Sequence, residues 1–246
     1  MDTWHILTAT AGTYLLAGFI KGVIGLGLPT VAVGLLGLMM SPAHAAAILV
    51  VPSLVTNVWQ GFAGGKIAGL LRRLAPLLIG ICIGTLIGAV WLPPGSSQGG
   101  VWLGVLLVLY AALCLVNIHF VVPPRHETWV GVMAGIVNGV LAVATGVFVI
   151  PGVPYIQALK LERDRMVQAL GLSFTVSTIA LALALAHAGE MAPTLLWPSL
   201  VALIAAIIGM VVGQLVRGLV KAATFRVFFF AGLLLLGAHL ALRGLL

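Results

Sequence analysis

Eight long apolar segments, separated by short polar stretches, constrain this sequence more than any other feature. They cover residues 5–40, 43–63, 74–92, 101–122, 129–155, 166–187, 195–216 and 224–245. A transmembrane helix needs about 20 mostly apolar residues, so each segment is long enough to cross a bilayer. Only 7% of the residues are charged, whereas a soluble domain carries about 25%. The sequence therefore predicts an all-α polytopic membrane protein surrounded by lipid.

The two longest segments begin similar halves of the chain. The first is interrupted near Gly25–Pro29 and the fifth near Ala144–Gly146. Just before these breaks, AGFIKGV (17–23) and AGIVNGV (134–140) share four identical residues. Each half then continues with three ordinary spans, which predicts a duplication. We expect a first repeat over residues 1–122, a linker at 123–128 and a second repeat over 129–246.

The positions of Lys and Arg predict the orientation of the segments. Loops rich in these residues stay in the cytoplasm. If all the basic loops share that side, each interrupted segment must enter and leave on one face, as a helical hairpin. The two halves would then be inverted-topology repeats, a common plan of secondary transporters; eight plain spans are the alternative. Ten of the twelve basic residues lie in these loops: Lys66, Arg72, Arg73, Arg125, Lys160, Arg163, Arg165, Arg217, Lys221 and Arg226.

The two interruptions are candidate binding sites. Irregular backbone at membrane depth is tolerated where it lines a cavity or is buried in protein, and the free N–H groups of a helix N-terminus attract anions. We expect the two tips to face each other. Small residues also pack membrane helices tightly, which is the alternative interpretation of each glycine. The candidates are Gly22, Gly25, Gly27 and Thr30 in the first half, and Asn138, Gly139, Thr145 and Gly146 in the second.

Lys21 is the only basic residue deep within an apolar segment. An intramembrane charge is costly and usually functional, so we expect Lys21 to neutralise an anion. The alternative is that its side chain extends to the membrane surface. The second and sixth segments add rows of polar groups that could line a cavity, although hydroxyls also bond their own helix backbone. These rows comprise Ser53, Thr56 and Asn57, and Ser173 and Ser177.

The acidic residues narrow the chemistry further. All five lie at a terminus or in loops: Asp2, Glu127, Glu162, Asp164 and Glu190. No buried carboxylate is then available to bind sodium or relay protons. We expect a site for an anion, no cofactor and no metal. The net charge of +7 comes from short loops rather than a basic arm, which argues against nucleic acid as a partner. Cys82 and Cys114 lie in apolar segments and are expected to be buried.

The string GFIKGVIGLG (18–27) resembles the opening motif of the TauE/SafE sulfite exporter family, also called toluene-sulfonate uptake permeases. The strings at 41–46, 80–89 and 208–215 continue the resemblance. It implies a carrier of sulfite, thiosulfate, sulfoacetate or other organosulfonates in a bacterial inner membrane. This chain departs from the family in two ways. An uncharged polar residue is usual where Lys21 stands, and Ala142 and Ala144 replace glycines in the second half.

Transport is the function that these features favour, rather than enzymatic catalysis. Exporting one negative charge from a cell with a negative interior gains about 2.3 kcal/mol per 100 mV, which favours export without a coupling ion. A passive anion channel would have similar features. An intramembrane serine protease is a further alternative, since Gly171–Phe174 resembles the rhomboid serine motif and His239 could serve as its base. The pattern is compatible with a homodimer and does not require one.

Overall fold

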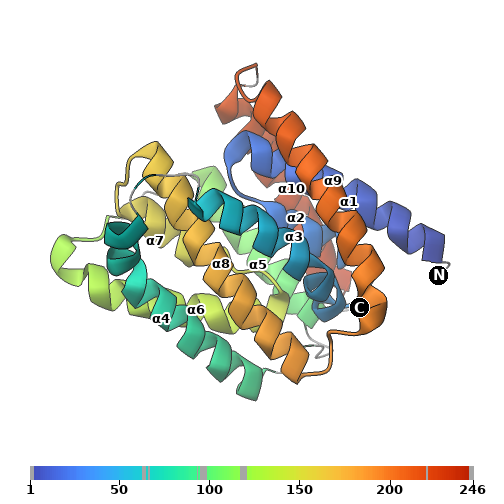
Figure 1. The fold of residues 1–246 in the computed structure, drawn as a ribbon, viewed down its shortest axis with the longest axis horizontal. Helices are drawn as coiled ribbons and strands as arrows, with labels where there is room; N and C mark the ends of the chain where they lie inside the picture. The colour runs from blue at the N-terminus through green and yellow to red at the C-terminus, as the bar shows by residue number, and fades with distance from the viewer. Residues whose placement is uncertain are drawn as a thin grey trace.

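The computed structural model describes residues 3–62, 65, 67–92, 94, 99–116, 121–219 and 221–243, and these residues form helices and loops without a strand. Eight of the helices are long and apolar enough to cross a membrane, which confirms the all-α polytopic class (Figure 1). They are α1 (Thr3–Ile24), α3 (Pro42–Phe62), α4 (Ile67–Trp91), α5 (Gly99–Val116), α6 (Glu127–Thr145), α8 (Arg163–His187), α9 (Leu196–Val216) and α10 (Ala222–Arg243).

Two short helices follow α1 and α6, where the sequence predicts the interruptions. They are α2 (Leu28–Leu36) and α7 (Gly152–Ala158). The break after α1 contains Gly25 and Gly27, with φ of 83° and 112°, and α6 ends at Gly146, with φ of 73°. This left-handed region favours glycine. Each long segment is therefore one full-length helix followed by a short one. Single turns of 3₁₀ helix, Pro124–His126 and Pro193–Leu195, precede α6 and α9.

After each short helix, the chain has returned toward the end of the bundle where the preceding long helix begins. Tyr155 of α7 donates a hydrogen bond of 2.9 Å to the carbonyl oxygen of Glu127, at the start of α6. Gln60, near the end of α3, donates through Nε2 to the carbonyl oxygen of Gly25, at the end of α1 (2.8 Å). Helices α1 and α3 therefore run in the same direction, and the chain between them crosses back.

Glycines hold two helix pairs, α4–α6 and α1–α9, in close backbone contact. A Cβ on Gly84 of α4 would overlap the carbonyl oxygen of Ile136 of α6. One turn further along both helices, Gly88 packs against Val140. Helices α4 and α6 therefore run parallel. The same register joins α1 to α9, where Gly18 packs against Ala206 and Gly22 against Met210.

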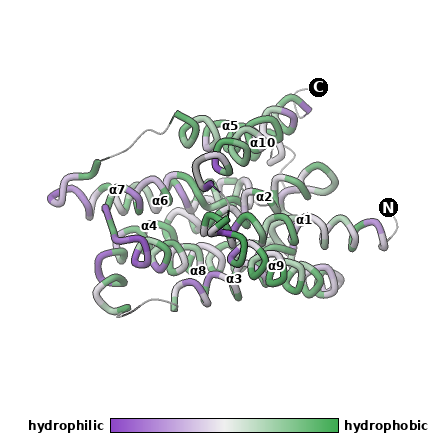
Figure 2. The backbone as a smooth tube through the Cα atoms, turned by 90° about the horizontal axis from the view of Figure 1, so that it is seen from above, coloured by the Kyte–Doolittle hydropathy of each residue, from purple (hydrophilic) through white to green (hydrophobic). Residues whose placement is uncertain are grey.

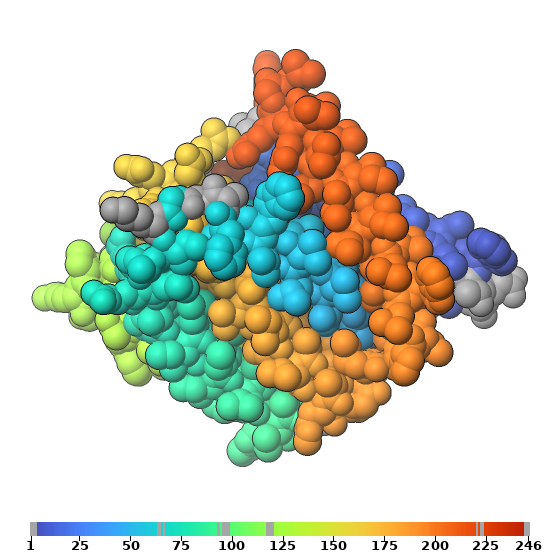
Figure 3. Space-filling model, viewed as in Figure 1, coloured from blue at the N-terminus to red at the C-terminus, as the bar shows by residue number. Residues whose placement is uncertain are grey.

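The pair α3–α8 forms the centre of the bundle and runs antiparallel. These are the two most buried of the candidate spans. Ser53 contacts Thr178, whereas Gly61, further along α3, packs against Gly171, earlier in α8. The last pair, α5–α10, packs beside α2. Figure 3 shows α3, α4, α8 and α9 side by side on one face of the molecule.

An ion pair joins α4 to α6 at the end of the bundle where both begin. Arg73 donates to both carboxylate oxygens of Glu127, from Nε (3.0 Å) and Nη2 (2.7 Å). Its Nη2 also lies 3.3 Å from the carbonyl oxygen of Leu159, just after α7. Figure 2 shows hydrophilic residues gathered on this side, where α4, α6 and α7 meet. Lys66, which belongs to the same basic loop in the sequence, and Asp2 lie outside the described residues.

Removing the Arg73 side chain is expected to destabilise this end modestly. Arg73→Ala should lower the free energy of unfolding by about 0.5–1 kcal/mol, because both partners are partly exposed to solvent. In detergent, this corresponds to a melting temperature lower by about 2 °C. Arg72→Ala, at the exposed neighbouring position, is the matched control. An equal effect of both changes would contradict a specific role for the ion pair.

The prediction that both cysteines are buried is wrong for Cys82, which is exposed on α4. Gly80, Gly84 and Gly88 turn one face of α4 toward α6. At about 100° per residue, position 82 lies on the opposite face. Cys114 of α5 is partly buried. An apolar segment predicts a helix, but only its neighbours decide which face is covered.

Candidate functional site

Lys21, in the last turn of α1, is held in the interior by polar groups of α3. The residue is 4% exposed. Its Nζ donates a hydrogen bond of 3.0 Å to Thr56 Oγ1 and another to Asn57 Oδ1. Both acceptors are neutral. The alternative that Lys21 extends to the membrane surface is therefore wrong in this conformation.

A chain of hydrogen bonds continues from Lys21 across α3 to α8. Asn57 Nδ2 donates to Ser53 Oγ (2.9 Å), one turn earlier, as expected for two residues on the same face. Ser53 Oγ lies 3.0 Å from Thr178 Oγ1. Thr56 also donates to the carbonyl oxygen of Pro52 (2.7 Å), the backbone bond that helical threonines often make. Thr178 joins this chain of hydrogen bonds only because α3 crosses α8.

The second half contributes a neutral counterpart. Asn138 occupies the position in AGIVNGV that Lys21 occupies in AGFIKGV, and it is also buried. Its Nδ2 lies 3.5 Å from Ser177 Oγ, at the limit of a hydrogen bond. In the described part of the chain, Asn138 Oδ1 and Ser173 Oγ are buried without a hydrogen-bond partner. These two groups are free to bind a ligand.

The two tips do not face each other, so that expectation is wrong. Gly25 lies beside Gln60, near the end of α3, whereas Gly146 packs against Ala46, near its beginning. These positions on α3 are 14 residues apart, or about 21 Å along the helix. The physical reason is that α1 and α6 each cross the bundle before the chain turns. The hydrogen-bonded chain of Lys21, Thr56, Asn57, Ser53 and Thr178, here called the polar cluster, lies between the levels of the tips.

The remaining candidates at the tips have structural contacts. Thr30 Oγ1 donates to the carbonyl oxygen of Gly27 (2.9 Å) and Thr145 Oγ1 to that of Leu141 (2.7 Å). A Cβ on Gly22 would overlap the backbone of α9, and one on Gly139 would overlap that of α4. Both glycines thus have the packing role that is the alternative interpretation of small residues.

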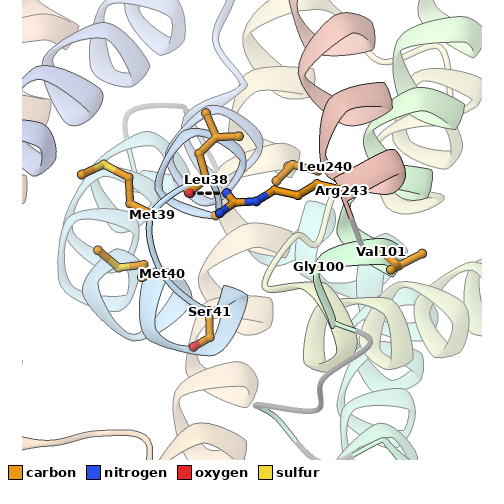
Figure 4. Close-up of a pocket in the computed structure, with 9 residues that line it drawn as sticks. Leu38, Met39, Met40, Ser41, Gly100, Val101, Leu240 and Arg243 are labelled. Carbon is orange, nitrogen blue, oxygen red and sulfur yellow. Dashed lines mark hydrogen bonds between the residues drawn. The ribbon is translucent and has the colours of Figure 1, made fainter. Parts of the chain in front are cut away.

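Two cavities lie outside the polar cluster. One, of about 440 Å³, is lined by the turn between α2 and α3 and by the ends of α5 and α10. There Arg243 Nη1 donates to the carbonyl oxygen of Leu38 (2.7 Å), and Figure 4 shows this contact crossing the cavity. The other, of about 660 Å³, is a mostly apolar groove between α4 and α8 that includes the exposed Cys82. The cluster residues line neither cavity and are buried, so the cluster is closed in this conformation.

The chemistry of the cluster suits an anion. Lys21 is the only charged residue among the buried residues that the structure describes. Its ammonium has three N–H donors and makes two hydrogen bonds to protein. Nearby hydroxyl and amide groups offer further donors to an oxyanion. No group of His, Cys, Asp or Glu side chains that could hold a metal occurs in the described residues.

The alternative of a serine protease fails on geometry. Ser173 is buried in α8, whereas His239 is exposed on α10. Helix α10 packs mainly against α5, and α8 mainly against α3. A serine nucleophile needs its base within hydrogen-bond reach, and this arrangement keeps the two residues apart.

Comparison with known proteins identifies the family. No curated protein and no solved structure matches the chain. The model of the family described as "Sulfite exporter TauE/SafE" matches residues 10–240, nearly the whole sequence. The match includes α1, with Lys21, and every helix that contributes to the polar cluster. Together with the eight candidate spans, it shows that this chain belongs to the TauE/SafE family of membrane transporters.

Proposed function

We propose that the protein exports small sulfur-containing oxyanions across a bacterial inner membrane, with Lys21 as the centre of the binding site. Sulfite, thiosulfate, sulfoacetate and other organosulfonates form the candidate class. One observation carries the proposal: the buried amino group of Lys21, 4% exposed, has only neutral oxygens as partners. A buried charge without a counter-charge is destabilising by several kcal/mol. An anion that enters the cluster supplies the counter-charge.

The groups around Lys21 provide donors for such an anion. The third N–H of its ammonium and the Ser53 hydroxyl can point toward a bound oxygen. The Thr178 hydroxyl now donates to the carbonyl oxygen of Phe174 (2.6 Å) and would have to leave that bond to contact the anion. Asn138, Ser173 and Ser177 add neutral polar groups from the other half. Of these, the hydroxyl of Ser173 can donate to an anion, and Ser173 Oγ is buried without a hydrogen-bond partner in the described residues. Gly25 and Gly27 lie near one end of α3 and Gly146 lies near the other. We propose that the anion passes along the bundle between these two levels.

The directions of the helices support an inverted repeat with the site between its halves. Helices α1 and α3 run one way, and α8 runs antiparallel to α3. Each half also buries its first helix against the third spanning helix of the other half, as α1–α9 and α6–α4. The proposed cytoplasmic end is the one where Arg73 lies, because positive loops stay inside. Movement of one half against the other would open the closed cluster to either side.

A passive channel is the second candidate. It needs a continuous open route, whereas the residues of the cluster are buried. Membrane potential drives a negative charge outward through either device, by about 2.3 kcal/mol per 100 mV. Saturation and exchange kinetics distinguish the two, since only a carrier must rearrange once for each anion.

The test is flux in sealed liposomes that contain purified protein. Vesicles are loaded with sulfite, thiosulfate or sulfoacetate, and potassium with valinomycin sets the potential. We expect saturable efflux driven by an inside-negative potential and accelerated by substrate on the opposite side. Protein-free vesicles and vesicles loaded with glycerol are the controls. Flux that rises linearly with concentration would assign a channel, and no flux of any of these anions would overturn the proposal.

A further inference from the structure

We propose that Thr10 and Tyr14 line the outer half of the anion route, and that their hydroxyl groups bind the anion between Lys21 and the end of the bundle where α1 begins. This inference rests on the proposed function, because it needs an anion site at Lys21. It adds a path and two specificity-determining residues, neither of which the sequence pattern singles out.

The three residues lie on one face of α1. A helix turns about 100° per residue, so positions 14 and 21 differ by only about 20° around the axis, as do positions 10 and 21. At a rise of 1.5 Å per residue, Tyr14 lies about 10 Å and Thr10 about 16 Å from Lys21 along the helix. Between Tyr14 and Lys21, this face of α1 carries Ala17, whose side chain is only a methyl group. A row of polar groups therefore leads away from the cluster.

Both hydroxyls are fully buried and lack a partner. Thr10 and Tyr14 are each 0% exposed, and neither Thr10 Oγ1 nor Tyr14 Oη has a hydrogen-bond partner in the part of the chain that the structure describes. Buried threonines elsewhere in the bundle donate to the carbonyl oxygen four residues earlier, as Thr85 and Thr178 do, and so does the exposed Thr8 of α1. A buried hydroxyl without a hydrogen-bond partner destabilises the folded protein. Two such hydroxyl groups on the same face of α1 as Lys21 indicate that their hydrogen-bond partner is a bound ligand rather than a group of the protein.

The other faces of α1 are already occupied. Gly18 and Gly22 pack against α9, and Leu15 and Leu16 are exposed on the surface that meets lipid. The remaining face contains Lys21, which bonds to α3. Thr10 and Tyr14 are therefore directed toward the interior rather than toward lipid or α9.

The equivalent helix of the second half, α6, lacks this row of hydroxyl groups. The match of AGFIKGV to AGIVNGV places Glu127 and Gly131 at the positions of Thr10 and Tyr14. A Cβ on Gly131 would lie 2.7 Å from Tyr155 Oη, so this hydroxyl fills the available space. Tyr155 Oη itself donates to Glu127. At the corresponding place in the second half, the space is filled by Tyr155 and its hydroxyl has a hydrogen-bond partner. In the first half, the hydroxyls of Thr10 and Tyr14 have none in the described residues.

Cysteine labelling tests the path without relying on transport. Thr10→Cys and Tyr14→Cys are made in a background in which Cys82 and Cys114 are replaced by alanine. A membrane-impermeant methanethiosulfonate that carries a sulfonate group is added to proteoliposomes, and mass spectrometry measures the adduct. We expect both cysteines to react. Leu16→Cys, on the lipid-facing surface of the same helix, is the matched control and should stay unlabelled, because thiolates form in water and not in lipid.

Two conservative variants test the hydroxyl groups themselves. Tyr14→Phe and Thr10→Val keep the packing and remove the polar atom. With the anion that the wild type carries best, each is expected to lower flux about fivefold to tenfold, which corresponds to one lost hydrogen bond of about 1 kcal/mol or slightly more. Unlabelled cysteines at both positions, or wild-type flux in both variants, would overturn this inference and leave the proposed function intact. A wild-type protein that carries no anion would overturn the proposed function instead.

Discussion

Lys21→Met is expected to lower anion flux about 100-fold, which corresponds to roughly 3 kcal/mol of lost binding in the transport cycle. Methionine has similar length and keeps the apolar stem, so the change removes the charge and the N–H donors. In the wild type, Nζ contacts only the neutral oxygens of Thr56 and Asn57, and we propose that the anion supplies the counter-charge. Without the ammonium, an anion in the buried cluster has no partner of opposite charge.

Stability measurements separate this effect from misfolding. Lys21→Met leaves Asn57 Oδ1 without its donor, which costs about 1–3 kcal/mol. It also removes the larger cost of burying an unpaired charge, so the melting temperature of this variant in detergent should equal or exceed that of the wild type. Arg125→Gln removes an exposed positive charge before α6 and should leave flux unchanged. Undiminished flux in Lys21→Met would place the anion elsewhere and reduce Lys21 to a structural residue.

Gly84→Ala is expected to cause the largest loss of stability among glycine-to-alanine changes in α4. The added Cβ would overlap the carbonyl oxygen of Ile136, and backbone atoms surround this point. Backbone cannot move aside as a flexible side chain can, so α4 and α6 must separate. Overpacking of this kind costs about 1–3 kcal/mol, and the melting temperature should fall by about 5 °C or more.

Gly69→Ala in the same helix is the matched control. Nothing lies within 4 Å of a Cβ at this position. Alanine favours a helix over glycine by up to about 1 kcal/mol, so this variant should be as stable as the wild type or slightly more stable. Thermal unfolding in detergent, followed by size-exclusion chromatography, compares the two. Equal melting temperatures would contradict the close contact of α4 with α6.

The sequence by itself determined the elements of the fold, because each depends on short stretches of chain. The length of six apolar runs predicted spanning helices, and the two interrupted runs predicted helical hairpins. The glycines at 25, 27 and 146 marked the breaks, since they adopt φ values of 83°, 112° and 73° there. The spacing of Ser53 and Asn57 predicted a shared face, and their hydrogen bond of 2.9 Å confirms it. Such local relations follow from the geometry of a single helix.

Only the tertiary structure decided which residues meet. Lys21 was recognisable as unusual, but its burial depends on Thr56 and Asn57, 35 and 36 residues away. The same distinction applies to Thr178, which becomes part of the cluster only where α3 crosses α8, and to the tips, which lie at opposite ends of α3. A helix can turn any face inward while keeping its local pattern. The energies that select one face, close backbone packing and the need to satisfy buried polar groups, arise only when distant helices are brought together.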